Sequence, residues 1–484
     1  MSTAEPRRVS FGSLALCPAC LLLAALAFLA WREDCWGDEA FTIRRVSASW
    51  DQLYHPFAHR VEGVGHPFDP RFVYDFNPPL YFAVIRLLAG KDPGVFVTRW
   101  FSILPALGAL FVLAAWCRSS LGLQAARSLI LLYALSPAVL YFGHEARPYA
   151  LPLFLASLAL HLTQRHAGDP KRLFAVLFFG SALGCLMNYH LAWWVISFAF
   201  VLLALAAKPA GGMGRRSAWA GLLGLVLGSL TAVAAILPQR QMLAIVKGES
   251  GPPLSFGLLR SALALPLAVP GGPHVPAGFL LSLAVLALAA ALLVRSPQRG
   301  LGAAALALWL LPVALPILLH LALATPFTDR YTLFALPGWF LTVGWIAREV
   351  SERGGWGRRA AQLVAVACIL VCALGSLEIL RRPFRAPWQP AVQALLAKAE
   401  PGDYYTIDPD WLNICFAVNA RRPPPAAYAY LGNGIPPEAR RIWIIGHSTL
   451  GPIVCETLEK NGWRFEPVSP SDGMWLWRAT PTTE

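Results

Sequence analysis

The chain has 484 residues, of which 56% are hydrophobic and only 14% are charged, whereas a soluble domain carries about 25% charged residues. This composition excludes an ordinary soluble domain and predicts an α-helical polytopic membrane protein embedded in a lipid bilayer. The net charge of +13 arises from Lys and Arg in short clusters between apolar runs, and because they form no continuous basic stripe, no nucleic-acid partner is expected.

Eleven apolar runs, most of them near 20 residues long, are predicted to cross the membrane as helices. They cover residues 11–31, 95–116, 125–142, 148–164, 172–187, 190–207, 217–238, 277–294, 301–324, 331–347 and 359–380. The first run is long enough to span and no A-x-A site precedes the acidic segment after it, so we expect no cleaved signal peptide. The shorter apolar run at 78–90 is predicted to be an interfacial or re-entrant helix.

The basic clusters give an orientation, because Lys and Arg favour the cytoplasmic ends of spans. With eleven spans, every basic cluster between spans falls on the cytoplasmic side, whereas counting 78–90 as a span would reverse all later loops. The loop at 32–93 and everything after Arg381 then lie outside. We therefore expect a multi-pass protein of the inner (plasma) membrane.

Alternating helix and strand patterns follow the last span. "QPAVQALLAKAE" and "GPIVCETLEKNGW" read as helices, and "DYYTID" and "RRIWIIGH" read as strands. Such alternation predicts a small extracytoplasmic α/β domain at 384–484. Residues 1–383 are predicted to form the transmembrane domain, with a large first outer loop at 32–93.

The nine cysteines show no metal-binding spacing. Cys17 and Cys20 resemble a CxxC motif, but they lie inside an apolar run, whereas redox and zinc sites need exposed thiolates. We interpret this pair as structural and predict no metal site from the cysteines.

Polar residues gather near the predicted outer ends of the spans, and the inner loops hold mostly basic clusters. The outer set is Asp38, Glu39, Asp75, Asn77, His144, Glu145, Arg147, Tyr149, Asn188, His190, Asp329, Arg330 and Tyr331. Each has a structural alternative: the acids at 38–39 suit a helix N-terminus, and Glu145 with Arg147 suits a local ion pair. Arg330 could equally pair with Asp329, and either histidine could be an interfacial residue.

Four stretches of this outer set carry a family resemblance. They are "WGDEAF", "NPPLYF", "GHEARPYAL" and "DRYTLFALP". In this order, they resemble the GT-C class of polyprenyl-phosphate-sugar glycosyltransferases, in particular bacterial relatives of the protein O-mannosyltransferases and of the lipid A aminoarabinose transferase. Relatives often have His where this chain has Asn77.

The resemblance implies a transferase that moves a sugar from a polyprenyl-phosphate donor to a hydroxyl acceptor on the outer face, with inversion. It implies that Asp38 is the catalytic base and Glu39 its partner. Near a membrane surface that limits water, the pKa of Asp38 is expected to rise. Because neighbours on a helix point about 100° apart, the two acids cannot both face one partner.

Further roles follow from the chemistry of a phosphate leaving group. It leaves without protonation, so a single base suffices, whereas a glycoside hydrolase needs two carboxylates. Glu145 is a second candidate acid. Fixed cations should stabilise the departing phosphate, and the candidates are Arg147, Arg330 and Arg99, although Arg99 also suits a snorkelling interfacial residue.

Substrate contacts are predicted for His144, Tyr149, His190 and Tyr331, although aromatic residues mark membrane interfaces generally. Asp38, Glu39, Glu145 and His190 would also suit a divalent metal. The related mannosyltransferases work without one, so neither metal nor other cofactor is expected.

Two other functions fit the composition. A transporter or flippase of lipid-linked sugars would use the same arginines, but transporters usually place charges near the bilayer midplane, whereas these acids gather at one face. A non-catalytic scaffold displaying the C-terminal domain would leave the outer acids and arginines unexplained.

Overall fold

The computed structural model describes residues 11–54, 77–209, 212–237, 254–269, 271–323, 327–352, 356–381, 387–408, 412–420, 422–431, 434–446, 450–469 and 474–482. The chain forms two compact units. Unit 1 comprises Met1–Leu29, Asn77–Tyr81 and Arg99–Arg381, and unit 2 comprises Ala30–Phe76, Phe82–Thr98 and Arg382–Glu484. Unit 2 therefore groups most of the first loop with the C-terminal region, whereas the sequence placed that loop in the transmembrane domain. Asp75 lies outside the described residues.

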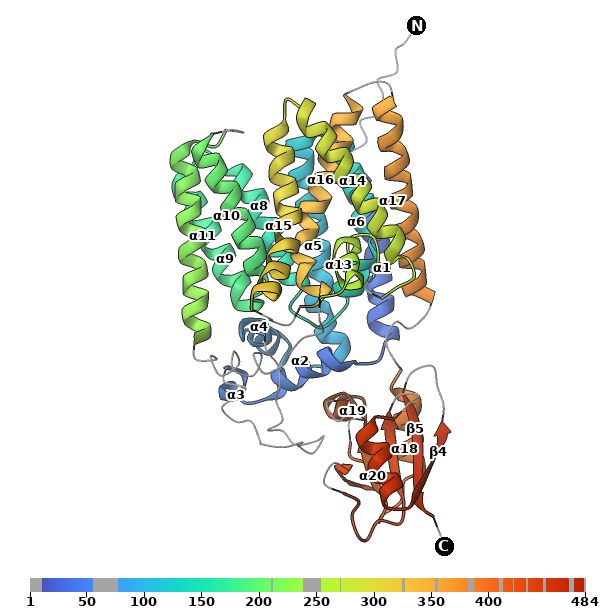
Figure 1. The fold of residues 1–484 in the computed structure, drawn as a ribbon. Coiled ribbons are helices and arrows are strands. Elements are labelled where there is room, and N and C mark those ends of the chain that lie inside the picture. Colours follow the sequence, from blue (N-terminus) through green and yellow to red (C-terminus); the bar gives the residue numbers. More distant parts are fainter. Residues whose placement is uncertain are drawn as a thin grey trace. The chain divides into compact units, whose positions relative to one another are not determined.

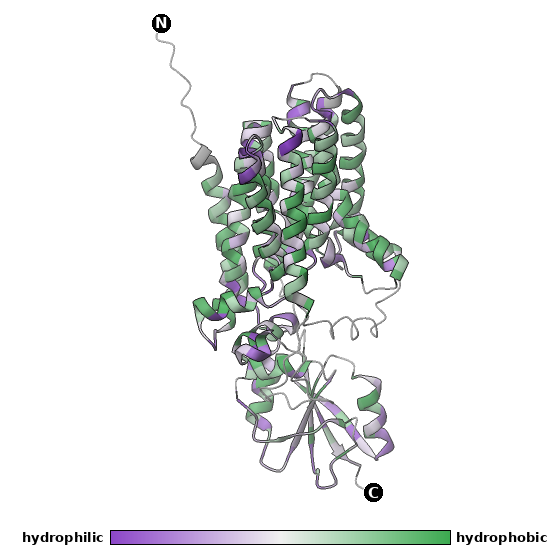
Figure 2. Ribbon diagram, turned by 90° about the vertical axis from the view of Figure 1, so that its left-hand side faces the viewer, coloured by the Kyte–Doolittle hydropathy of each residue, from purple (hydrophilic) through white to green (hydrophobic). Residues whose placement is uncertain are grey.

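Unit 1 is a helical bundle (Figure 1). Its elements are α1 (Phe11–Arg32), α5 (Val95–Leu121), α6 (Leu123–Ala134), α7 (Pro137–Gly143), α8 (Ala150–Arg165), α9 (Pro170–Met187), α10 (Leu191–Ala207), α11 (Arg215–Ile236), α13 (Phe256–Ala264), α14 (Val275–Arg295), α15 (Arg299–Leu323), η2 (Asp329–Ala335), α16 (Leu336–Ser351) and α17 (Trp356–Arg381), with the last residues of α1 and the first of α5 belonging to unit 2. A helix occupies every predicted span. Figure 2 shows that hydrophobic residues dominate these helices.

The predicted count of eleven spans is not confirmed. Among the described residues, seven helices are long and apolar enough to cross a membrane, or up to eight if the bent pair α6 and α7 forms one span. That pair bends by 57°, because Ser136 precedes Pro137 and takes an extended conformation. α8, α10 and α16 have only 16, 17 and 16 residues, or about 24–26 Å, against a hydrocarbon core of about 30 Å.

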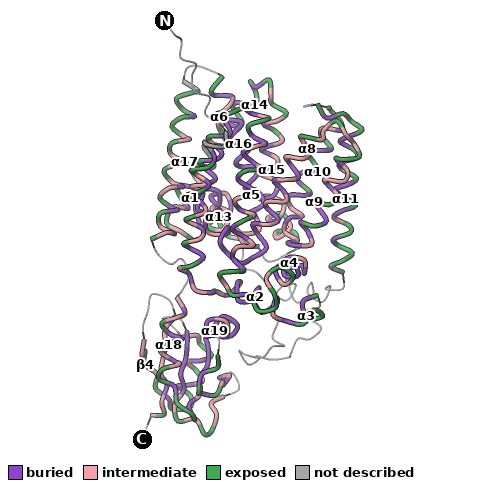
Figure 3. The backbone as a smooth tube through the Cα atoms, turned by 180° about the vertical axis from the view of Figure 1, so that it is seen from behind, coloured by how far each residue is buried: buried purple, intermediate pink, exposed green. Residues whose placement is uncertain are grey.

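Close helix packing organises one side of the bundle, where α11 lies on α9. A Cβ at Gly224 would lie 2.4 Å from the carbonyl oxygen of Phe174, and one at Gly228 would lie 2.2 Å from that of Phe178. Small residues four apart let two membrane helices approach closely. Many residues of α11 are exposed (Figure 3), and several of those on the opposite face are apolar, such as Leu223 and Leu230, as expected for contact with lipid.

Unit 2 contains three helices of the first loop and an α/β region. They are α2 (Gly37–Ser47), α3 (Trp50–Tyr54), α4 (Leu80–Ala89), α18 (Gln389–Lys398), β1 (Tyr404–Ile407), α19 (Asn413–Ala420), β2 (Ala427–Tyr428), β3 (Ile442–Gly446), α20 (Pro452–Lys460), β4 (Trp463–Ser469) and β5 (Trp475–Pro481), with α4 beginning in unit 1. At ten residues, α4 is about 15 Å long and too short to span.

The five strands form one mixed sheet in the order β2-β1-β3-β5-β4. β1 pairs in parallel with β2 and β3, and β5 pairs antiparallel with β3 and β4. The predicted C-terminal helices and strands are present as α18, β1, β3 and α20. β3 is buried along its whole length, which explains its continuous apolar sequence.

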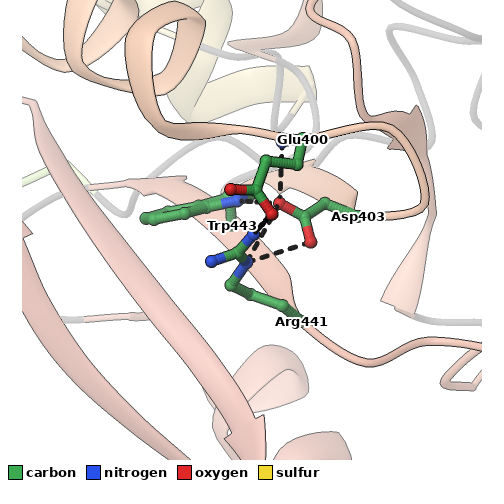
Figure 4. Close-up of polar contacts among 4 residues, drawn as sticks. All are labelled: Glu400, Asp403, Arg441 and Trp443. Atoms are coloured by element: carbon green, nitrogen blue, oxygen red, sulfur yellow. Dashed lines mark hydrogen bonds and ion pairs between the residues drawn. The ribbon is translucent and has the colours of Figure 1, made fainter.

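A polar cluster joins the starts of β1 and β3 (Figure 4). Asp403 accepts hydrogen bonds from Arg441 Nε at 2.9 Å and from Trp443 Nε1 at 2.9 Å, and Arg441 also pairs with Glu400 at 2.8 Å. Burial alone would raise the pKa of Asp403, but these hydrogen bonds outweigh it and hold the pKa below its ordinary value. While Asp403 is ionised, the cluster therefore holds together the N-terminal ends of the two inner strands β1 and β3.

Candidate functional site

The acidic pair opens helix α2 in unit 2. Asp38 and Glu39 lie in its first turn, where carboxylates interact favourably with the helix dipole. The two side chains differ in environment, because Glu39 is fully buried and Asp38 is half-buried. The two acids of the pair therefore lie in different environments.

The turn before α2 is held by the C-terminal region. The Asp34 carboxylate accepts hydrogen bonds from the backbone N–H groups of Trp388 and Gln389, at 2.8 and 3.0 Å, at the start of α18. Asn419 Nδ2 on α19 donates to the Cys35 carbonyl at 2.7 Å. Two independent contacts therefore fix the chain immediately before the acids.

Apolar packing reinforces this attachment. Cys35 and Ala40, on either side of the acidic pair, belong to the same buried core as Trp388, Ile414 and Phe416. Burial, followed by the negative charges of Asp38 and Glu39, raises the pKa of Cys415. α19 therefore lies directly beside the acids, and its thiol stays protonated.

The far end of α2 is tied to the rest of the first loop. Arg45 is fully buried, donates from Nε and Nη2 to the Leu53 carbonyl at 3.0 and 2.9 Å, and lies 4.4 Å over the Phe82 ring. Arg86 donates to the Val46 carbonyl at 3.2 Å. The buried Arg45 and the half-buried Arg86 fix the C-terminal end of α2, so the helix is anchored at both ends.

In unit 1, residues 144–149 form a tight segment between α7 and α8. His144 Nδ1 donates to the Leu140 carbonyl at 2.6 Å, which fixes the tautomer. Arg147 N–H donates to the Glu145 carbonyl at 2.7 Å, and Tyr149 N–H donates to the Arg147 carbonyl at 2.8 Å. All four of these predicted residues are buried, so this segment is part of the core and not a surface loop.

Two neighbouring elements clamp this segment. Ser102 Oγ on α5 donates to the Arg147 carbonyl at 3.2 Å, and Tyr81 OH lies 3.4 Å from the same hydroxyl. Asn188 Nδ2 donates to the Pro148 carbonyl at 2.8 Å, and its Oδ1 accepts from His190 N–H at 2.9 Å. Through Asn188, the segment is connected to the start of α10.

The start of α10 is connected in turn to η2. The rings of His190 and Tyr331 stack with their centroids 3.9 Å apart. His190, at the start of α10, therefore contacts the residue next to Arg330 in the chain.

The described residues thus fall into two groups. Unit 2 holds Asp38 and Glu39, and unit 1 holds His144, Glu145, Arg147, Tyr149, His190, Arg330 and Tyr331, joined by the contacts above. Arg99 lies on α5, one turn before Ser102, and is buried, so it does not extend along the surface as a snorkelling residue would. Within the described residues, no group of three or more His, Cys, Asp or Glu side chains is placed to hold a metal ion.

Sequence reasoning missed the residues that fix the candidate residues within each unit. Ser102, Asn419 and Asp34 were not singled out, and Asn188 was noted only as an outer-loop residue. Asn188 stands two residues before His190, so its adjacency to a candidate was a usable signal. Asn419 and Asp34 offered none, because their partners lie 384 and 354–355 residues away in the sequence.

Comparison with known proteins defines the fold. No family model and no curated protein matches the sequence. The structure is similar to ArnT from Cupriavidus metallidurans in the apo state, at 11% identity and a TM-score of 0.56, covering 96% of this chain and 97% of that chain. ArnT bound to undecaprenyl phosphate matches at 12% identity and a TM-score of 0.57, covering 97% and 98%.

The chain has the GT-C glycosyltransferase fold. The arabinofuranosyltransferase AftD from Mycobacteria also matches, at 16% identity and a TM-score of 0.51, covering 98% of this chain and 40% of that longer chain. The resemblance seen in the motifs is confirmed at the level of the GT-C fold, and together with the apolar helices it identifies a multi-pass membrane protein.

Proposed function

We propose that this protein is a membrane glycosyltransferase that moves a sugar from a polyprenyl-phosphate donor to a hydroxyl acceptor. The observation that carries the proposal is the match to ArnT over nearly the full length of both chains, in a structure bound to undecaprenyl phosphate. The donor carries a hexose or a pentose, and the acceptor is a hydroxyl of a glycan, lipid or protein.

Asp38 is the proposed general base. Its carboxylate takes the acceptor proton as the acceptor oxygen attacks the anomeric carbon. The bond from that carbon to the phosphate oxygen breaks, its electron pair stays on the phosphate, and the configuration inverts. The half-buried position of Asp38 supports this role, because its side chain is reachable, whereas the buried Glu39 suits a supporting acid.

Arg330, Arg147 and Arg99 are the proposed phosphate-binding cations. Guanidinium groups match phosphate oxygens in a bidentate manner, and cations fixed in advance stabilise the charge that develops on the leaving group. The clamps on residues 144–149 support preorganisation of Arg147. The stacking of Tyr331 on His190 supports a fixed position for the neighbouring Arg330.

The remaining candidates are assigned to the substrates. The stacked rings of His190 and Tyr331 are proposed to offer a flat face to a sugar, and His144 and Tyr149, at the two ends of the segment 144–149, are proposed to contact the substrates. Glu145 is proposed either to bind the acceptor or to anchor an arginine. No metal takes part in this scheme.

The reaction is proposed to occur at the outer face of the inner (plasma) membrane, following the distribution of Lys and Arg. A topology reporter fused after Arg127 tests this orientation. A cytoplasmic signal is expected, and an outer-face signal would overturn it.

The activity itself is tested with purified protein, polyprenyl phosphates carrying radiolabelled hexoses or pentoses, and membrane glycans and lipids as acceptors. We expect a labelled product whose anomeric configuration is inverted relative to the donor. Movement of the donor across proteoliposomes without any labelled product would instead favour a flippase.

A further inference from the structure

A groove in unit 1 lies away from the residues assigned to the reaction. It has a volume of about 580 Å³ and is lined by α6, α14, α16 and α17, which lie side by side in Figure 1. Its lining includes Ser351 at the end of α16, whereas Arg330 lies in η2, before the start of α16. Along α16, the groove extends from Val343, about 10 Å after Leu336, to Ser351, about 22 Å after it, and its lining includes none of the residues assigned to the reaction.

The α6 wall changes from polar to apolar along its length. Gln124, Arg127 and Ser128 line the groove at the start of the helix, and Leu131 and Leu132 follow one turn later. The spacings of three, four, seven and eight residues from Gln124 put all five on one face.

The α17 and α16 walls repeat this gradient in the same direction. Arg358 and Gln362 begin the α17 wall, and Cys368 and Ile369 continue it. α16 runs the other way along the groove, so Ser351, at its end, joins the polar part, and Val343 lies in the apolar part. Three helices thus build a groove with one polar and one apolar end.

The polar end is positively charged. Among the described residues that line the groove, two are arginines and none is acidic. Arg127 and Arg358 both lie near the N-termini of their helices, where the helix dipole adds further positive potential. This end matches an anionic headgroup, most directly a phosphate.

We propose that the groove binds an anionic phospholipid of the bilayer. The phosphate lies between Arg127 and Arg358, and one acyl chain lies along the apolar walls. From Arg358 to Ile369 the α17 wall rises by about 17 Å, close to the roughly 15 Å of hydrocarbon in one leaflet. A lipid here bridges α6, α14, α16 and α17.

The test measures which lipids co-purify with the full-length protein in mild detergent, by mass spectrometry. The variant pair Arg127→Gln with Arg358→Gln removes the headgroup partners, and Ala365→Trp fills the apolar part. The matched control, Arg165→Gln with Arg216→Gln, removes the same charge at exposed positions of unit 1 outside the groove. We expect anionic phospholipid to fall by about tenfold in both groove variants and to stay unchanged in the control.

A second measurement uses only the wild-type protein and therefore tests the proposal even if the groove variants fold poorly. Delipidated wild-type protein is titrated with vesicles of phosphatidylglycerol or of phosphatidylcholine, and its thermal midpoint is followed. We expect a saturable rise with phosphatidylglycerol only. Equal lipid content in all variants, equal rises with both vesicles, or co-purification of a polyprenyl phosphate in place of phospholipid would each overturn the proposal.

Discussion

The two units hold their proposed functional residues by different means. In unit 1, residues 144–149 and His190 are fixed by hydrogen bonds between neighbouring parts of a bundle whose helices pack through glycines and apolar side chains. In unit 2, the helix bearing Asp38 is fixed by hydrogen bonds and a hydrophobic core shared with residues near the C-terminus. The proposed base thus depends on the C-terminal region, whereas the proposed phosphate-binding arginines depend on the bundle.

Removing the base should have the largest effect. Asp38→Asn should lower the transfer rate by about 10²–10⁴-fold, the usual contribution of a positioned general base. Donor affinity should stay near the wild-type value, because the amide replaces the carboxylate with almost the same shape. Rates are measured with radiolabelled donor under single-turnover conditions.

Glu39→Gln is the neighbouring control for that experiment. A smaller loss is expected from Glu39→Gln than from Asp38→Asn. The reverse order would exchange the roles of the two acids.

A change in helix packing within unit 1 should have the second-largest effect. In Gly228→Leu, the new side chain begins 2.2 Å from the Phe178 carbonyl oxygen and 2.3 Å from Ser181 Oγ, so α11 must move away from α9. We expect a destabilisation of at least about 1–3 kcal/mol, seen as a lower thermal midpoint, together with weaker donor binding. Ala234→Leu, at an exposed position of α11, should leave both unchanged.

Loss of the contact between α19 and the turn before α2 should have an intermediate effect. Asn419→Ala leaves the buried Cys35 carbonyl without this donor, at a cost of about 1–3 kcal/mol. Hydrogen exchange should accelerate at residues 36–42, and kcat should fall more than KM rises.

Asn461→Ala is the matched control. Asn419 Nδ2 also donates to the Cys415 carbonyl at 2.8 Å, and Asn461 Nδ2 likewise donates to the carbonyl four residues earlier, at 2.7 Å, but at the exposed end of α20. Unchanged exchange at residues 36–42 in Asn419→Ala would separate α2 from the C-terminal region and contradict the account.

Lowering the pH should have the smallest of these effects, a loss of stability around β1 and β3 in unit 2. Because the pKa of folded Asp403 lies below its ordinary value, its contribution to stability is present above about pH 4 and is lost as pH falls through the folded pKa. Hydrogen exchange of β1 and β3 should therefore accelerate at low pH. Asp403→Asn should already show faster exchange at neutral pH, with little further change on acidification.

Glu466→Gln removes an exposed partner of Arg478 and should change exchange little, since surface pairs contribute about 0–1 kcal/mol. A wild-type response to acid in Asp403→Asn would show that another group controls the acid sensitivity.

Local patterns predicted much of the fold. The apolar runs predicted a helix at each span, because about 20 apolar residues bury their backbone groups only as a helix. β1 and β3 were visible because they are apolar and buried. β4 and β5 were missed, since Arg464, Glu466 and Arg478 interrupt their apolar pattern, and β2 has only two residues.

Helix length and long-range contacts could not be predicted in the same way. Hydropathy does not show that Ser136, before Pro137, breaks a span, or that α8, α10 and α16 stop short of the bilayer thickness. The motifs singled out Asp38 as a candidate, but nothing in its neighbourhood indicates that Asn419, far along the chain, holds the turn before it.

The proposed roles divide between a base in unit 2, Asp38, and a phosphate-binding cation in unit 1, Arg330. The most direct test of these roles compares donor binding and sugar transfer in Asp38→Asn and Arg330→Ala, each purified as the full chain and supplied with the same labelled donor. We predict that Asp38→Asn binds the donor like the wild type and does not transfer the sugar, whereas Arg330→Ala loses donor affinity by about tenfold or more. Wild-type transfer by Asp38→Asn would contradict the role of Asp38 as the base, and wild-type donor affinity in Arg330→Ala would contradict the role of Arg330 in binding the phosphate.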